Sequence, residues 1–180
     1  MNHLVVISVS ITCAVLSFIG CKNSVEPPRN PTPGITVTQR DGSGGYKVLS
    51  VDTADWRLNP QPKPDFQFEQ TGPLSTYISP AFPNPSSDSV SIQFSLSSGG
   101  SVTFRIFDAD SNLVRDLFEQ DLGAGFCRVN WNLKDDTGTR VKPGFYLCVY
   151  FWPARLYKVG TNHSQYLDVG IFGSGDIQVN

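Results

Sequence analysis

The chain has 180 residues, enough for one domain with extensions. Its formal charge is −2, so no basic excess indicates a nucleic-acid partner. Only 17% of the residues are charged, whereas 16 are Gly and 13 are Pro. We therefore expect many turns and little surface helix. The composition is typical of an all-β module that works outside the cytoplasm.

The first segment is an apolar run, residues 4–20, that ends in glycine and is followed by Cys21. With its "FIGC" sequence it resembles a bacterial lipoprotein signal peptide over residues 1–20, which implies cleavage before Cys21 and acylation of its thiol. A transmembrane anchor is the alternative, because the run approaches spanning length. Residues 21–33 are polar and Pro-rich, so we expect a flexible tether. "CKNS" has no acidic residue after the cysteine, which favours the outer membrane.

Residues 34–72 are expected to form an N-terminal hairpin and an extended connector. The segments "ITVTQ" and "YKVLSV" flank a Gly-rich turn, as in a hairpin, and prolines interrupt the sequence that follows. We expect the stable core to begin at about residue 73. Trp56 either packs against that core or is exposed to stack on a ligand. The same two interpretations apply to Tyr150 and Trp152.

Residues 73–180 have the two-residue period of β-strands. In 89–96 the apolar residues are Val90, Ile92, Phe94 and Leu96, and the polar ones expected to face water are Ser89, Ser91, Gln93 and Ser95. Segments 101–108 and 123–133 repeat the pattern, and 113–122 is expected to be a shorter strand or an edge. Segment 144–152 is apolar on both faces, which predicts a strand covered on both sides. Segments 164–172 and 176–180 are two further predicted strands.

Short strands separated by turn residues predict an antiparallel β-sandwich. Four segments make this specific: "SPAFPNPSSDSVSIQFSL", "VTFRIFDADSNLVRDL", "GAGFCRVNWNLKDDTG" and "VKPGFYLCVYF". In this order they resemble the Ig-like domain of flagellar hook-capping proteins and the related C-terminal sorting domain of type IX secretion. The resemblance covers residues 79–152 and leaves 153–180 as additional C-terminal strands. It implies an Ig-like fold, with docking to protein assemblies or recognition by a secretion machine.

Cys127 and Cys148 lie in two of the predicted strands, in a compartment that permits disulfides. They are either disulfide-bonded or two buried free thiols that act as small apolar fillers. The sequence has no C-x-x-C motif and no His and Cys cluster that would indicate zinc.

The sequence "DTGT" at 136–139 matches the catalytic tripeptide of aspartic proteases. Such catalysis needs two carboxylates that share a proton, and Asp136 lies in a polar run after Lys134 and Asp135. We therefore interpret Asp136 as part of the hairpin turn between two antiparallel strands.

A second match places Asp108, Asp110, Asn112 and Glu119 at calcium-loop positions one, three, five and twelve. Leu113 occupies the position where the loop requires glycine. Two interpretations remain: a looser Ca²⁺ site formed by Asp108, Asp110 and Asn112, or side chains that cap a turn. No other cofactor is expected.

No catalytic set can be assembled from the sequence. His163 is the only imidazole outside the signal segment, and neither a nucleophile elbow nor a nucleotide-binding motif occurs. We therefore predict a non-catalytic envelope lipoprotein that mediates protein–protein interaction or assembly, with an envelope or secreted protein as its partner. The alternatives are a carbohydrate-binding module, with Trp56, Tyr150 or Trp152 as the stacking platform, and a surface protein sorted by a secretion machine.

Overall fold

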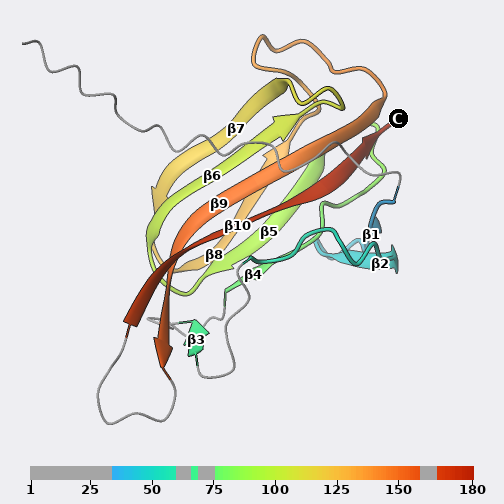
Figure 1. Ribbon diagram of the computed structural model, residues 1–180. Coiled ribbons are helices and arrows are strands. Elements are labelled where there is room, and N and C mark those ends of the chain that lie inside the picture. The colour runs from blue at the N-terminus through green and yellow to red at the C-terminus, as the bar shows by residue number, and fades with distance from the viewer. Residues whose placement is uncertain (1–33, 60–65, 69–75, 159–165) are drawn as a thin grey trace, which may run out of the picture.

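The computed structural model describes residues 34–59, 66–68, 76–158 and 166–180. The predicted signal segment, Cys21, the tether and His163 lie outside these ranges. Two antiparallel sheets pack face to face as a β-sandwich, which confirms the all-β prediction (Figure 1). The described residues contain no helix, and hence no helix that could cross a membrane.

The larger sheet has the strand order β10-β9-β6-β7, with β3 paired to the end of β9. Its strands are β3 (Phe66–Phe68), β6 (Gly100–Phe107), β7 (Leu113–Leu122), β9 (Gly144–Lys158) and β10 (Tyr166–Val179). The smaller sheet has the order β4-β5-β8, made of β4 (Tyr77–Ile78), β5 (Val90–Leu96) and β8 (Gly125–Trp131). A separate hairpin pairs β1 (Val37–Arg40) with β2 (Tyr46–Ser50), as predicted.

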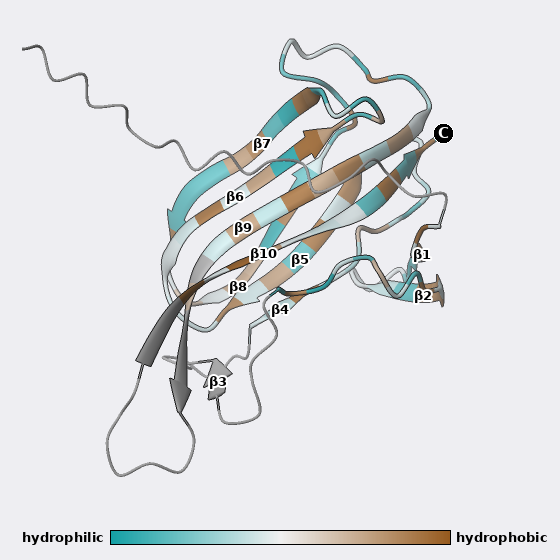
Figure 2. Ribbon diagram, viewed as in Figure 1, coloured by the Kyte–Doolittle hydropathy of each residue, from teal (hydrophilic) through white to brown (hydrophobic). Residues whose placement is uncertain are grey.

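The core lies between the two sheets and follows the predicted alternation. The alternating apolar residues of β5 and β6 that were predicted to face the core are at most 1% exposed: Val90, Ile92, Phe94, Leu96, Val102, Phe104 and Ile106. Figure 2 shows hydrophobic residues along these strands and along β9. Residues 146–150 are all buried, so β9 is covered on both faces, as its apolar sequence predicts.

The prediction that alternate serines of β5 face water is wrong for two of them. Ser91 is 3% exposed and Ser95 is 1% exposed. The segment that follows β4 continues alongside β5, where Phe82 and Ser91 exchange two backbone hydrogen bonds of 2.8 Å. The Ser91 hydroxyl also donates to Asn130 Oδ1 at 2.7 Å, which satisfies the buried polar group.

The last two predicted strands are in fact one continuous strand, β10. The sequence "GSG" at 173–175 looks like a break between two strands, but its glycines are there because neighbouring groups pack closely against the backbone. A Cβ at Gly173 would overlap the Arg57 carbonyl, and one at Gly175 would overlap the Trp56 indole. Glycine is needed here because another part of the chain approaches the strand closely.

The N-terminal extension belongs to the same core, so the expectation that the core begins at about residue 73 is wrong. Trp56 is 7% exposed and belongs to the main hydrophobic cluster. Its ring lies 6.3 Å from that of Tyr150, at an interplanar angle of 9°. The sequence could not show this contact because the two residues are far apart in the chain.

Candidate interaction surface

The turn between β1 and β2 is stabilised by hydrogen bonds among its own residues. Asp41 Oδ1 accepts hydrogen bonds from the Ser43 amide, the Ser43 hydroxyl and the Gly45 amide. These bonds favour the ionised carboxylate and lower the pKa of Asp41. Gly42 and Gly44 have φ of 80° and 90°, the left-handed region that favours glycine.

An aromatic contact fixes the hairpin to the rest of the fold. Tyr46 of β2 stacks on the fully buried Phe82, with ring centroids 4.9 Å apart, and its hydroxyl lies 2.8 Å from that of Tyr77. The guanidinium carbons of Arg40 and Arg128 lie 5.9 and 5.8 Å from the Phe82 ring centroid. Two cations are thus held beside one ring, at the distance of cation–π contacts.

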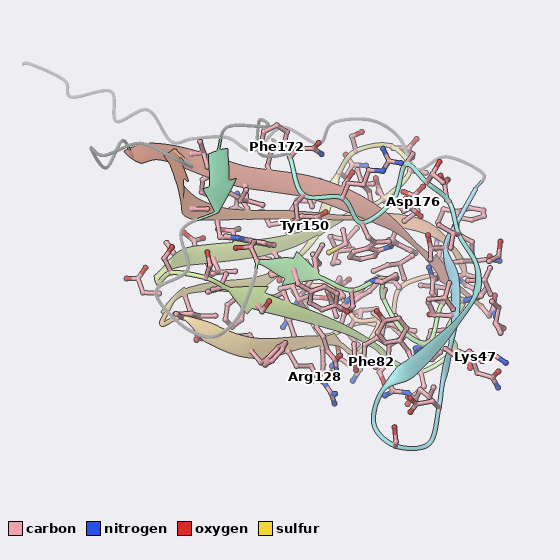
Figure 3. The ribbon with its side chains drawn as sticks, turned by 90° about the horizontal axis from the view of Figure 1, so that it is seen from below. Lys47, Phe82, Arg128, Tyr150, Phe172 and Asp176 are labelled. Carbon is pink, nitrogen blue, oxygen red and sulfur yellow. The ribbon has the colours of Figure 1, made fainter. Side chains whose placement is uncertain are left out.

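Arg128 of β8 connects the smaller sheet to the turn of the hairpin, because its Nη2 donates to the Gly44 carbonyl at 2.8 Å. Lys47 adds a third exposed cation on β2. In Figure 3, Lys47, Phe82 and Arg128 all lie on the lower side of the view. This side of the molecule therefore carries a small group of positive charges.

Large apolar side chains are exposed in the same region. Val48 is 40% exposed, Leu49 55% and Val51 64%. Phe126, at the start of β8, is 71% exposed. It lines an open groove of about 270 Å³ together with Gln93, Cys127 and Arg128. We call these exposed apolar residues, the three cations and the groove the interaction surface.

The opposite end of the N-terminal extension closes the edge of β10. The Trp56 amide donates to the Ser174 carbonyl at 2.9 Å, and Asn59 and Phe172 exchange backbone bonds of 3.0 and 2.8 Å. Further along, the Ser86 amide donates to the Gln178 carbonyl at 2.9 Å. The edge of the larger sheet is therefore covered by two segments that precede it in the chain.

Asn84, the central residue of the "PNP" sequence, is fully buried beside the covered edge of β10. Its Nδ2 donates to the carbonyls of Thr36 at 3.1 Å and Asp176 at 2.9 Å, and its Oδ1 accepts from the Gln178 amide at 2.9 Å. One side chain thus satisfies three backbone groups from two distant segments. The sequence could not single out Asn84, because its partners lie far from it in the chain.

Two buried carboxylates meet where the extension contacts β10. Asp55 is 6% exposed and Asp176 is fully buried. Asp55 accepts hydrogen bonds from the amides of Thr36 at 3.2 Å and Asp176 at 3.3 Å. Burial, with the negative charge of Asp176, raises the pKa of Asp55 from 3.8 to about 7. Neither residue was singled out from the sequence, because their proximity depends on the fold.

The predicted calcium-loop residues form a turn between β6 and β7. Asp108 Oδ1 accepts from the amides of Asp110 at 3.0 Å and Asn112 at 2.8 Å, and Asp108 Oδ2 accepts from Asn112 Nδ2 at 3.0 Å. Glu119 lies on β7 and contacts Arg105 Nη2 at 3.2 Å, so it takes no part in a twelve-residue loop. Ca²⁺ binding by Asp108, Asp110 and Asn112 stays a prediction. In the described part of the chain, no three His, Cys, Asp or Glu side chains gather as a metal site would require.

The proposed stacking platform is wrong, because its three rings lie in the core. Trp56 is 7% exposed, Tyr150 0% and Trp152 1%. Tyr150 and Trp152 stack on each other with centroids 5.6 Å apart. Figure 3 shows Tyr150 between the sheets, where no sugar could reach its face.

Cys127 and Cys148 are free thiols, so the structure contradicts a disulfide between them, and of the two only Cys148 is buried as the alternative expects. Cys127 lies on β8 of the smaller sheet and Cys148 on β9 of the larger one. Burial raises the pKa of both thiols, which opposes formation of the reactive thiolate.

The "DTGT" turn is a short local hairpin, closed by an antiparallel bridge between Lys134 and Arg140, although the strands it connects, β8 and β9, belong to different sheets. Asp135 is the capping carboxylate and accepts from the amides of Thr137 and Thr139, both at 2.9 Å. The exposed Asp136 lies 3.5 Å from Arg115 Nη1 and accepts from the Asp116 amide at 3.2 Å. It therefore joins the turn to β7.

No protein-family model matches the chain, and neither does any curated protein sequence. Among solved structures, the chain is similar to dimeric latent PorU from Porphyromonas gingivalis, with a TM-score of 0.37 and 18% sequence identity. The match covers 61% of this chain and 10% of the PorU chain. The chain therefore spans a tenth of the length of that protein.

Proposed function

We propose that the chain is a non-catalytic lipoprotein of the cell envelope that binds another protein through the interaction surface. The observation that carries the proposal is the exposure of Val48, Leu49, Val51 and Phe126 beside three cations. Exposed apolar groups are stabilised when a partner removes them from water. Aromatic and Arg side chains are also the types most enriched at protein–protein interfaces.

The absence of catalysis is part of the proposal and is supported by how the chemically capable groups are used. Asp108 and Asp135 cap turns, and Asp136 contacts Arg115. Cys148 is fully buried, which raises the pKa of its thiol. These groups of the described residues serve the fold.

The location is proposed from the sequence. Acylation at Cys21 would attach the chain to a membrane, and the tether at 21–33 would separate the sandwich from it. Metabolic labelling with palmitate tests the anchor, and Cys21→Ser is expected to abolish both labelling and membrane retention. Labelling that persists in this variant would contradict lipidation at Cys21.

Photo-crosslinking in whole cells tests the binding function. A photoreactive phenylalanine analogue at Phe126, which is 71% exposed, is expected to capture an envelope protein. The same analogue at the exposed Asn132 is the matched control, because Asn132 lies outside the interaction surface. Mass spectrometry then identifies the adduct. Equal yields at both positions, or no adduct at Phe126, would contradict the proposal.

A further inference from the structure

We infer that the outer edge of β2 receives an extended, acidic segment of a partner protein as an added strand. This inference rests on the proposed function and names the kind of partner that the interaction surface binds. Strand addition uses free backbone groups for affinity and side-chain contacts for selectivity. The hairpin offers both.

The backbone of β2 has hydrogen-bonding groups that face away from β1. Thr38 of β1 exchanges backbone bonds with Asn84, of 2.8 and 3.1 Å, so its amide and carbonyl point away from β2. Thr38 is paired with Val48. In an antiparallel pair of this kind, both residues direct their backbone groups outward. The Val48 amide and carbonyl therefore face the outer edge of β2, and none of the described residues pairs with that edge.

The side chains of β2 are exposed on both faces of the strand. Val48 lies on one face and Lys47 on the other, because successive strand residues alternate, and the register shifts at Leu49. Val48 and Leu49 are 40% and 55% exposed. An added strand would cover apolar surface of both residues, as expected of an edge that receives a partner.

The charges around the hairpin determine the sign of the partner. Arg40, Lys47 and Arg128 are exposed there. The acids are Asp41 of the hairpin turn and the partly buried Asp52 after β2, and the Oδ1 of each accepts turn hydrogen bonds. A strand with Glu or Asp next to its apolar residues would complement these cations, and a basic strand would be repelled.

Other strand edges of the described structure are protected. The first part of β7 is covered, since the Asp136 amide donates to the Val114 carbonyl at 3.1 Å. The rest of β7 carries the exposed acids Glu119 and Asp121. β8 ends its sheet with the exposed polar residues Arg128 and Asn130, next to the exposed Phe126. Charged and polar side chains discourage unwanted pairing, and β2 has several exposed apolar residues instead.

The probe for the test is a fluorescent nine-residue peptide of alternating Glu and Val, with a Lys and Val twin as its control. Full-length protein is expected to bind the acidic peptide at least about tenfold more tightly than the twin. Amide hydrogen exchange at Val48 should slow when the acidic peptide binds. Equal binding of the two peptides, no binding, or unchanged exchange at Val48 would overturn the inference.

Val48→Pro removes the outward amide and leaves the bonds between β1 and β2 in place, because proline is tolerated where the lost donor faces solvent. Val48→Thr keeps the amide and is the matched control. We expect about a tenfold loss of peptide binding for Val48→Pro, equivalent to about 1.4 kcal/mol, and little change for Val48→Thr. Circular dichroism verifies that both variants fold. Lys47→Glu gives an independent measurement, since it should weaken binding of the acidic peptide and strengthen binding of its Lys and Val twin.

Two other occupants of the edge give different results. Binding to vesicles of anionic phospholipid that depends on Lys47 but not on the Val48 amide would assign the surface to a membrane and overturn strand addition. A dimer that Val48→Pro dissociates would assign the edge to a second copy and overturn the acidic partner. Peptide binding without any cellular adduct at Phe126 would contradict the proposed function and leave the edge as inferred. A cellular adduct at Phe126 without peptide binding would support the proposed function and overturn strand addition at β2.

Discussion

The edges of β10 and β2 are treated in opposite ways. The β10 edge is closed by backbone bonds from Trp56, Asn59 and Ser86 and by the Asn84 side chain, although these residues lie far from β10 in the sequence. The β2 edge has no partner among the described residues and carries exposed Val48 and Leu49. One chain can therefore seal an edge with distant segments while it leaves another open. The difference indicates that the β10 edge serves stability and the β2 edge serves contact.

Trp56→Ala should have the largest effect on the closed edge. Removing this buried indole is expected to lower the free energy of unfolding by about 3–5 kcal/mol, because it leaves a cavity against Tyr150. Urea denaturation measures the change. Phe126→Ala is the control, since Phe126 is 71% exposed and its loss should change stability by less than about 0.5 kcal/mol. Equal effects would show that the extension does not stabilise the sandwich.

Asn84→Ala tests the side-chain hydrogen bonds at the same closed edge. The substitution leaves the Gln178 amide and the carbonyls of Thr36 and Asp176 without their side-chain partner. We expect a loss of about 3 kcal/mol, measured by urea denaturation, because buried groups are costly when unsatisfied. Asn132→Ala, at an exposed position, should be nearly neutral. A neutral Asn84→Ala would mean that water replaces the amide.

Gly175→Ala examines the close approach of Trp56 to β10. The added methyl group would overlap the indole, so we expect a loss of about 1–3 kcal/mol from overpacking. Gly123→Ala is the control, because a Cβ there meets nothing within 4 Å. Thermal unfolding of both variants gives the comparison. A stable Gly175→Ala protein would show that Trp56 can move away from the strand without cost.

These contacts also show what the sequence could predict. Alternation located the core residues of β5 and β6 correctly, because strand periodicity is a local property. The Gly173 to Gly175 segment was interpreted as a break, because the local pattern cannot show that Arg57 and Trp56 approach these glycines. Asn84 and Asp55 were missed for the same reason, since their partners come from distant parts of the chain.

The candidate site was less predictable than the fold. The residues proposed from the sequence were aromatics, cysteines and turn acids, and large aromatic residues such as Tyr150 are usually selected for the core. The segment 46–51 was identified as a strand, but its exposure depends on how the hairpin attaches to Phe82. A sequence pattern alone does not report whether an edge is covered.

The buried carboxylate at the closed edge predicts a dependence on pH. Asp55 has a pKa of about 7 in the folded protein and an ordinary value of 3.8. The folded state therefore binds more protons than the unfolded state between these values, so this group makes stability fall as pH rises from about 4 to about 7. Asp55→Asn should remove this part of the slope. Urea denaturation from pH 4.5 to 7.5 measures it.

The slope, and not the absolute stability, is the informative quantity, because the substitution also changes hydrogen bonds to Thr36 and Asp176. Asp52 and Asp176 are the other acids whose charges raise the pKa of Asp55. Asp88→Asn, at an exposed position, is the control and should leave the slope unchanged. Identical slopes for Asp55→Asn and the natural protein would contradict the raised pKa.

Leu49→Glu should have the smallest effect on stability, and it distinguishes the β2 edge from the β10 edge most clearly. Leu49 is 55% exposed, so the free energy of unfolding is expected to change by less than about 0.5 kcal/mol. The same change should reduce the crosslinked adduct at Phe126, because it replaces apolar contact with a negative charge that repels an acidic partner. A loss of stability as large as that of Trp56→Ala would mean that β2 belongs to the core. A neutral variant that loses its partner would show that Leu49 contributes to contact and not to the fold.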